Sequence, residues 1–229
     1  MNKTIWMCWF QGRDHKSIPQ LNRVCLEKWG KLNPTWNTII LDSNSISDYL
    51  PEYEEIVGQA KHKRAWVHHG DLVRLLLLKK YGGVWSDASV YPMTPLDEWL
   101  EPVINRTGFF AYRFSPQNQN RETASWFLAV NQPHHQLINA WCDKFMDTFI
   151  NLKKMVWFQI HTDLSYVYDT NPSVRNIIEN MVQIDQSIPH SPSRSSLGNG
   201  KGWEGRAESY MYKRPRPPKW FTTDMWPLL

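Results

Sequence analysis

The pattern of hydrophobic and polar positions in the first part of the chain switches between strand-like and helix-like spacing. Ile5 to Phe10 and Trp36 to Leu41 are short apolar runs, which predict two buried strands. Leu21 to Leu32 has apolar residues at helical spacing. The clearest helix runs from His69 to Tyr81, because Gly82-Gly83 follows it and glycine commonly ends a helix. Strands that alternate with helices favour an α/β fold with a mostly parallel central sheet flanked by helices.

The rest of the chain continues this pattern less regularly. Further strands are predicted in three segments: 84–90, 108–114 and 125–131. Helices are predicted in three others: 45–59 (as a short pair), 133–152 and 172–181. The aromatic stretch 156–168 fits either class. Ser, Gly and Pro predict a loop over 189–202, and the prolines of 215–218 oppose regular structure in the basic tail that begins at Arg206.

Composition narrows the class of protein. The 229 residues are 41% hydrophobic and 21% charged, which is typical of a soluble globular chain, and we predict a single domain over 1–229. A net charge of +4 weakly favours anionic partners. The basic residues form no dense patch in sequence, which argues against nucleic acid as a partner. Three widely spaced cysteines indicate a reducing compartment, so we expect a cytoplasmic protein.

One segment combines the residues that could carry chemistry. Asp71 and Arg74 are three residues apart and share a helix face, and on this spacing alone a structural ion pair is the simpler interpretation. Gly82-Gly83 then allows a tight turn, and Asp87 falls where the next strand should end. Ligands of open α/β sheets bind at the carboxyl ends of strands. A carboxylate there can hold a divalent cation beside a diphosphate, which favours a binding site.

These residues resemble a known group of enzymes. The succession of Asp71-Leu-Val-Arg74, an apolar stretch, Tyr81-Gly-Gly83 and Asp87-Ala-Ser89 is similar to the DXD-containing sugar-binding glycosyltransferases. Within that group it most resembles the capsular polysaccharide synthesis proteins and their relatives in glycosyltransferase family 32. Ile5 to Gly12 resembles the first strand of the same group, and Ser125 to Ala129 resembles a later strand of the capsular family. The resemblance covers about the first 130 residues.

The resemblance implies a GT-A-like, Rossmann-like fold of nucleotide-diphospho-sugar transferases. The implied reaction moves a hexose-type sugar from a nucleotide-diphosphate donor, with a UDP-sugar favoured, to a saccharide or lipid-linked saccharide acceptor. It implies retention of configuration and a product in a capsule or lipopolysaccharide. Residues up to about 130 would bind the nucleotide sugar, and residues from about 131 to 229 would form the acceptor side and C-terminal part.

The resemblance also assigns roles to single residues. Asp71, Arg74 and Asp87 are the predicted catalytic residues, of which Asp71 and Arg74 contact the donor sugar or the diphosphate. Asp87 is expected to bind ribose and the metal, and Trp9 to lie near the nucleotide base. The predicted donor-binding set is Trp9, Asp71, Arg74, Gly83, Asp87 and Ser89.

The triplet departs from the pattern of the group at its third position, where Ser89 replaces a second carboxylate. A hydroxyl is a weaker ligand than a carboxylate for Mg²⁺ or Mn²⁺. The prediction is a divalent cation at Asp87 and Ser89. Three arrangements are open: help from a C-terminal carboxylate, a cation held mainly by the diphosphate, or Lys and Arg side chains in its place.

Other candidates lie outside this segment. His161 is either a core histidine or a group that reaches the metal or the acceptor, and Glu204 is a further candidate metal ligand. The basic, aromatic tail from Lys213 to Trp220 could contact anionic lipid at the inner face of a membrane. Two other functions stay open: a non-catalytic carbohydrate-binding protein, and a metal-dependent sugar-nucleotide hydrolase or nucleotidyltransferase.

Overall fold

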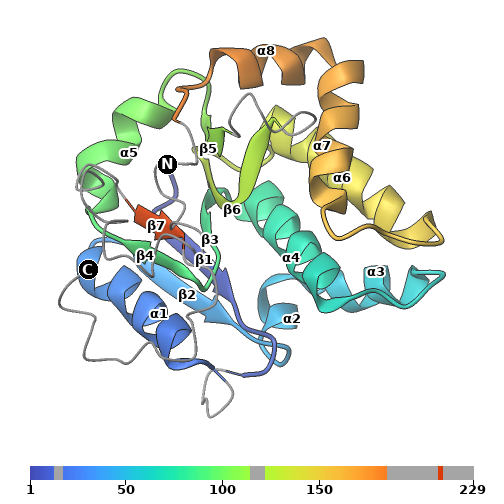
Figure 1. Ribbon diagram of the computed structural model, residues 1–229, viewed down its shortest axis with the longest axis horizontal. Helices are drawn as coiled ribbons and strands as arrows, with labels where there is room; N and C mark the ends of the chain where they lie inside the picture. Colours follow the sequence, from blue (N-terminus) through green and yellow to red (C-terminus); the bar gives the residue numbers. More distant parts are fainter. Residues whose placement is uncertain (13–17, 114–121, 185–210, 214–229) are drawn as a thin grey trace, which may run out of the picture.

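The computed structural model describes residues 1–12, 18–113, 122–184 and 211–213. Its centre is a five-stranded sheet in the order β2-β1-β3-β6-β5 (Figure 1). The strands are β1 (Thr4–Cys8), β2 (Asn37–Leu41), β3 (Gly83–Ser86), β5 (Phe109–Arg113) and β6 (Thr123–Val130). β1 is parallel to β2 and β3, whereas β6 is antiparallel to β3 and to β5. All strands of this sheet except β6 therefore point the same way, which confirms the predicted mostly parallel α/β sheet.

Helices cover both faces of the sheet (Figure 1). The helices of the described residues are α1 (Gln20–Leu32), α2 (Ile46–Tyr49), α3 (Tyr53–Gln59), α4 (Trp66–Tyr81), α5 (Leu96–Ile104), α6 (Gln136–Asn151), α7 (Gln159–Thr170) and α8 (Pro172–Asn180). α1 and α5 pack on one face, and α4, α6 and α7 share a core on the other. The predicted helices at 21–32, 45–59, 69–81, 133–152 and 172–181 are confirmed in kind.

The side chains of β1 explain why its sequence is a continuous apolar run. Ile5 and Met7 belong to the core beneath α1 and α5, whereas Trp6 belongs to the core beneath α4 and α6. Successive side chains of a strand point to opposite faces, so a strand covered on both sides needs apolar residues at every position. The same division holds in β3, where Val84 and Trp85 enter different cores.

Helix α4 is the element that positions the candidate site. Its side chains from Asp71 to Leu78 are all buried, including the charged ones. The helix ends at Gly82, which has a φ of 66° and whose N–H donates to the carbonyl of Leu78. Gly83 follows with a φ of 87°, and a Cβ there would lie 2.6 Å from the carbonyl oxygen of Thr4 in β1. Glycine is required at both positions, which confirms the predicted helix end and tight turn.

Three segments differ from the sequence prediction or extend it. The undecided stretch 156–168 is mainly the helix α7. Helix α5 was not predicted; it contains Pro102 and is stabilised by burial of apolar side chains such as Trp99 and Leu100. The strand β7 (Met211–Lys213) was not predicted either; it pairs antiparallel with β4 (Val90–Pro92). The rest of the tail, including Glu204 and 214–220, lies outside the described residues.

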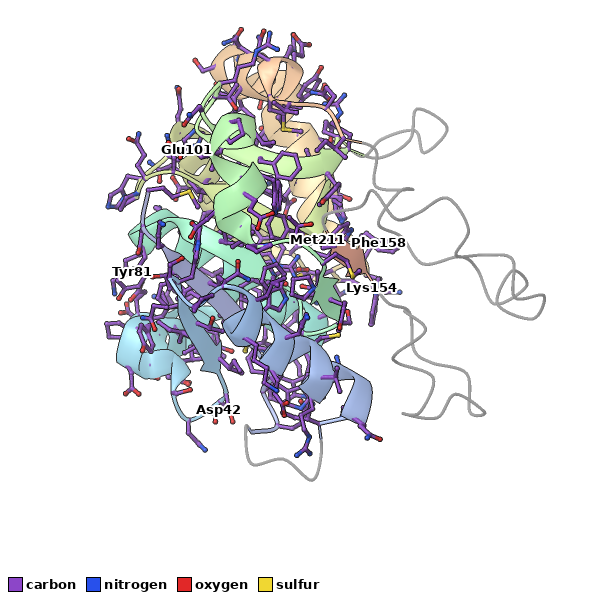
Figure 2. The ribbon with its side chains drawn as sticks, turned by 90° about the vertical axis from the view of Figure 1, so that its left-hand side faces the viewer. Asp42, Tyr81, Glu101, Lys154, Phe158 and Met211 are labelled. Atoms are coloured by element: carbon purple, nitrogen blue, oxygen red, sulfur yellow. The ribbon has the colours of Figure 1, made fainter. Side chains whose placement is uncertain are left out.

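A side view shows how the ends of these elements are distributed. In Figure 2, Tyr81 at the end of α4 lies on one side of the molecule, and Lys154, Phe158 and Met211 lie on the other. None of the helices in the described ranges has the length and apolar composition needed to cross a bilayer.

Candidate functional site

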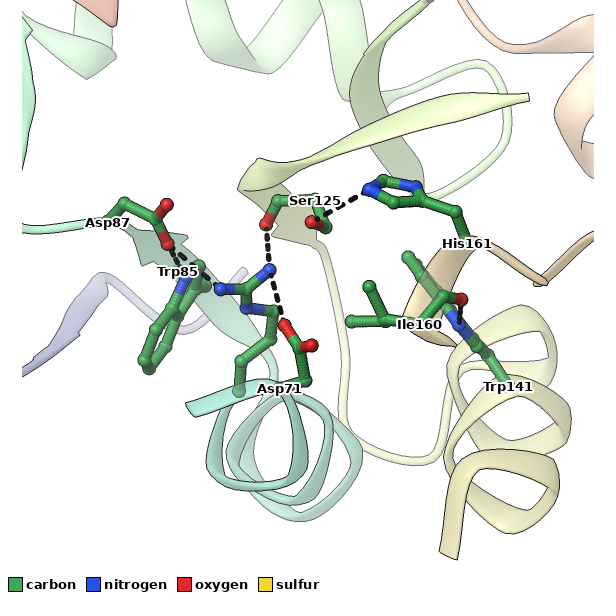
Figure 3. A network of polar contacts seen from close by, with 8 residues as sticks. Asp71, Trp85, Asp87, Ser125, Trp141, Ile160 and His161 are labelled. Carbon is green, nitrogen blue, oxygen red and sulfur yellow. Dashed lines mark hydrogen bonds and ion pairs between the residues drawn. The ribbon is translucent and has the colours of Figure 1, made fainter. Parts of the chain in front are cut away.

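The candidate site is organised by the guanidinium of Arg74, which projects from the middle of α4. Its Nη1 donates to the backbone carbonyl of Ser125 at 2.8 Å and lies 3.2 Å from Oδ1 of Asp71. Its Nη2 donates to Oδ1 of Asp87 at 2.9 Å. Figure 3 shows these contacts converging between α4, the end of β3 and β6. One buried cation therefore joins two carboxylates and a neighbouring strand.

Asp87 lies directly after β3, at the carboxyl end of that strand. Its backbone N–H donates to the carbonyl of Trp126 at 2.9 Å, and its own carbonyl accepts from Val90 at 3.0 Å, which closes the turn into β4. Trp85 Nε1 donates to the same Oδ1 that Arg74 contacts, at 3.0 Å. The carboxylate is thus oriented from two directions while its side chain stays 26% exposed. A fixed and partly open carboxylate is suited to meeting a ligand at this edge of the sheet.

Asp71 is in a different environment, because it is 3% exposed. Burial raises the pKa of its carboxyl from the ordinary 3.8 to about 7, with Arg74 acting in the opposite direction and Asp87 in the same direction. Its Oδ2 and the Nε of Arg74 are buried without a hydrogen-bond partner among the described residues. Arg74 therefore joins the buried Asp71 to Asp87 and holds Asp87 in place, and direct contact of Asp71 or Arg74 with a donor stays a prediction.

The network continues from β6 to α7. Ser125 Oγ and His161 Nε2 are 3.3 Å apart, and His161 is buried (Figure 3). The start of α7 is fixed to α6 by Trp141, whose Nε1 donates to the carbonyl of Ile160 at 2.8 Å. The histidine singled out in the sequence thus contacts the strand whose backbone accepts a hydrogen bond from Arg74.

The remaining predicted residues have separate surroundings. Ser89 is partly exposed in the turn between Asp87 and β4. Gly83 is buried at the start of β3, and its close approach to Thr4 accounts for the glycine without a ligand. Trp9 follows β1, is half-buried and packs against the core beneath α1 and α5. Its Nε1 is buried and has no hydrogen-bond partner in the described ranges.

The structure thus joins Asp71 and Asp87 through Arg74 and adds residues that the sequence analysis missed. Trp85 could have been found, because it is two residues before Asp87 and strand periodicity places both on one face. Ser125 contributes a backbone carbonyl, for which its side chain gives no signal. Two histidines beside the site have structural partners: His68 Nε2 contacts the carbonyl of Val156 at 3.0 Å, and His69 Nδ1 contacts the Tyr53 hydroxyl at 2.8 Å.

The donor set for a divalent cation is small. Within the described ranges, no group of three His, Cys, Asp or Glu side chains is arranged to hold a metal ion. Asp87 supplies one carboxylate and Ser89 at most a hydroxyl. Mg²⁺ in enzymes often keeps several waters and is held by one or two carboxylates together with substrate phosphates. The residues fit a cation shared with a diphosphate and do not fit one held by the protein alone.

A separate cavity lies elsewhere on the molecule. It has a volume of about 430 Å³ and is lined by residues that include Lys3, Trp36, Asp97 and Asn131. Lys3 precedes β1 and Asn131 follows the oppositely directed β6, so the cavity is at the sheet edge opposite Asp87. It is therefore not part of the candidate site.

Comparison with known proteins places this geometry in context. The chain is 28% identical over 102 residues to an initiation-specific alpha-1,6-mannosyltransferase of Candida albicans, which covers 43% of this chain and 26% of the relative. It is 30% identical over 100 residues to the protein of the same name from Saccharomyces cerevisiae, covering 42% of this chain and 21% of the relative. The match therefore spans about a quarter of the length of these curated relatives.

Solved structures agree in fold. The PaToxG glycosyltransferase matches with a TM-score of 0.50 and 16% identity, over 77% of this chain and 72% of that one. A glycosyltransferase involved in glycosylation of the major capsid of PBCV-1 matches with a TM-score of 0.51 and 10% identity, over 92% of each chain. These likenesses confirm the predicted GT-A-like fold. The family model described as capsular polysaccharide synthesis protein matches residues 1–194, and the chain therefore belongs to that family.

Proposed function

We propose that the protein is a glycosyltransferase that moves a sugar from a nucleotide-diphosphate donor to a saccharide acceptor in surface polysaccharide synthesis. Membership of the capsular family and the glycosyltransferase names of its relatives support the reaction class. The observation that carries the proposal is Asp87, a partly exposed carboxylate held at the carboxyl end of β3 by Arg74 and Trp85. Transfer with retention of configuration is part of the proposal by family resemblance.

The chemistry of the reaction fits the charges of this site. As the bond to the nucleoside diphosphate breaks, negative charge grows on the leaving phosphate and positive character grows on the sugar carbon. A carboxylate fixed before the donor arrives costs no reorganisation during the reaction. Asp87 is oriented in this way, and we propose that it binds the donor ribose and faces the diphosphate across a shared cation. Arg74 and Asp71 are proposed to position it and to reach the donor once the site is filled.

We propose that Asp87 shares a Mn²⁺ or Mg²⁺ ion with the donor diphosphate, with Ser89 as a weaker ligand. Such an ion neutralises the charge of the departing diphosphate. Trp9, beside the end of β1, is proposed to lie near the base, for which a UDP-sugar is the expected donor. The acceptor side is proposed to come from the part of the chain after residue 130.

A donor panel with two matched variants tests the proposal. Purified protein is incubated with nucleotide sugars, with and without a saccharide acceptor and Mn²⁺, and released nucleoside diphosphate is measured. Asp87→Asn should lower the turnover about 100-fold or more, since it removes charge from the centre of the site. Asp48→Asn changes an exposed carboxylate on α2 and should leave the turnover unchanged.

Each outcome separates one class of function from the others. Acceptor-dependent release that Asp87→Asn abolishes supports the transferase. Release without any effect of acceptor identifies a sugar-nucleotide hydrolase instead. Thermal stabilisation by a saccharide, together with no stabilisation by any nucleotide sugar and no turnover, identifies a non-catalytic carbohydrate-binding protein.

A further inference from the structure

Two loops far apart in sequence form one exposed surface of aromatic and basic side chains. We define this aromatic-basic surface as residues 60–66, which lead into the first residue of α4, and residues 152–158, between α6 and α7. Trp66 and Trp157 are 63% and 67% exposed, and Leu152, Val156 and Phe158 are also exposed. Large apolar side chains that gather on a surface usually mark an interaction site, whereas scattered ones need no explanation.

The two loops are held together by buried hydrogen bonds. Arg64 is buried, and its guanidinium donates to the backbone carbonyl of Phe149 at 2.6 Å and to that of Leu152 at 2.7 Å. The backbone N–H of Lys61, in the first loop, donates to the carbonyl of Ile150 at 3.0 Å, just before the second loop. These hydrogen bonds fix the backbone of the two loops relative to each other, so the exposure of their side chains is a property of the fold.

The charge of this surface has one sign. Lys61, Lys63, Lys153 and Lys154 are exposed, and neither 60–66 nor 152–158 contains an Asp or a Glu. Lys61 Nζ donates to the neutral Asn151 side chain at 2.8 Å, which leaves its charge uncompensated there. Four lysines thus flank two exposed tryptophans. Tryptophan prefers the headgroup region of a bilayer, and juxtamembrane lysines are attracted to anionic lipid.

We propose that the aromatic-basic surface docks the protein onto an anionic phospholipid bilayer, with Trp66, Trp157 and Phe158 entering the headgroup region. A second copy of the chain fits less well, because a symmetric contact would bring these lysines together. A neutral saccharide can stack on the tryptophan rings but carries no charge to match the four lysines, whereas anionic lipid matches both features. The surface contains no residue of the C-terminal tail, and the proposal does not depend on the proposed sugar transfer.

The surface adjoins the candidate site at two places. Trp66 begins the helix that carries Asp71 and Arg74, and its ring lies 5.2 Å from that of Phe10, just after β1. The Phe158 ring lies 6.0 Å from that of His161, which also contacts Ser125. Docking through this surface brings the edge of the site that contains Phe10 and His161 close to the lipid headgroups.

Vesicle flotation of the full chain tests the proposal. The probes are vesicles of phosphatidylcholine alone and of phosphatidylcholine mixed with phosphatidylglycerol, at low and high salt. The test variants are Trp157→Ser with Phe158→Ser, and Lys153→Gln with Lys154→Gln. The controls are Tyr166→Ser, an exposed aromatic on α7, and Lys31→Gln with Arg106→Gln, two exposed cations outside the two loops.

We expect binding to the anionic vesicles only, weakened by salt. Each basic residue near an anionic surface strengthens partitioning about fivefold, so the lysine pair should weaken it about 30-fold. The aromatic pair should reduce binding at both salt concentrations, and the controls should bind like the unaltered protein. All substituted residues are exposed, and unchanged circular dichroism and unfolding midpoints exclude misfolding.

Binding that both loop variants retain would overturn the proposal, whether the tail or another surface carries it. Absence of binding by the unaltered protein would overturn it as well. Loop variants that leave flotation unchanged but raise the KM for a soluble saccharide would assign the surface to the acceptor instead.

Discussion

Replacing Asp71 by Asn probes the electrostatics of the site in the free protein. Asp71 is 3% exposed, and burial raises its pKa from 3.8 to about 7. The folded state therefore binds more protons than the unfolded state between these two values. Below pH 3.8 the carboxyl is protonated in both states and costs nothing, and above pH 7 its ionisation destabilises the fold in full. Asp71 thus makes the protein less stable as the pH rises through this window.

The magnitude follows from the two pKa values. At about 1.4 kcal/mol per pH unit, the difference between 3.8 and about 7 corresponds to about 4 kcal/mol of unfolding free energy. More than half of this change falls between about pH 5 and pH 8. Asparagine keeps the shape of the side chain and does not ionise. Arg74 retains the Asp87 carboxylate and the Ser125 carbonyl, so we expect Asp71→Asn to be at least as stable as the unaltered protein at pH 8.

The assay is urea unfolding followed by tryptophan fluorescence across this pH range, with the variant subtracted from the unaltered protein. Asp163→Asn is one control, because burial raises the pKa of Asp163 to about 6. Ionisation of Asp163 should therefore also lower the unfolding free energy as the pH rises, over a lower pH range than for Asp71. Asp97→Asn is a control of opposite sign. Hydrogen bonds from Thr35 and Lys3 lower the pKa of Asp97, so its ionised form contributes stability that is lost as the pH falls.

The reasoning would be refuted if the unfolding free energies of Asp71→Asn and the unaltered protein differed by a constant amount from pH 5 to pH 8. Such a constant difference would mean that Asp71 stays ionised throughout, with its charge fully compensated by Arg74. The same conclusion would follow if Asp71→Asn were less stable than the unaltered protein by the same amount at pH 5 and at pH 8.

Further predictions concern the turn, the cation and the thiols. Gly83→Ala should destabilise the fold by about 2 kcal/mol or more, because its Cβ would clash with the Thr4 carbonyl at a positive φ. Gly58→Ala in α3 should instead raise the free energy of unfolding by about 0.5 kcal/mol, and urea unfolding measures both. Arg74→Lys should lower the turnover at least tenfold in the diphosphate-release assay, since one ammonium cannot reproduce a guanidinium's contacts with Asp87 and Ser125. Burial raises the pKa of Cys8 to about 12, so iodoacetamide at pH 8 should label it far more slowly in folded than in urea-unfolded protein, as mass spectrometry would show.

Much of the fold was predictable because its elements are bounded by local signals. The strand at residues 5–10 and the helix ending at Gly82-Gly83 follow from apolar runs and positive-φ glycines. Helix α5 was missed because its formation depends on burial of Trp99 and Leu100 against the sheet, and Pro102 in its interior opposes a helical prediction. β7 was missed for a similar reason, since its partner β4 is more than a hundred residues away in sequence.

The side chains of the site could be predicted from the sequence, whereas its backbone contact could not. Helix spacing and the expected strand end were enough to bring Asp71, Arg74 and Asp87 together as candidates. The contact of Arg74 with the Ser125 carbonyl depends on the register of β6 against β3, which no single sequence reveals. Burial of Asp71 likewise results from packing between α4 and later helices. The pairing of Arg74 with Asp71 is thus both the structural ion pair and the support of Asp87.

The burial of α4 also bears on how chains of this family can exchange segments. Leu72 and Leu75 of α4 share one core with Trp141 and Phe145 of α6. A chimera that takes α6 to α8 from a relative would replace the other half of that core and disturb the support of Arg74, since close-packed interiors tolerate few mismatched volumes. We therefore expect exchange of α6 to α8 alone to destabilise the fold, whereas substitutions at exposed loop positions leave this shared core unchanged.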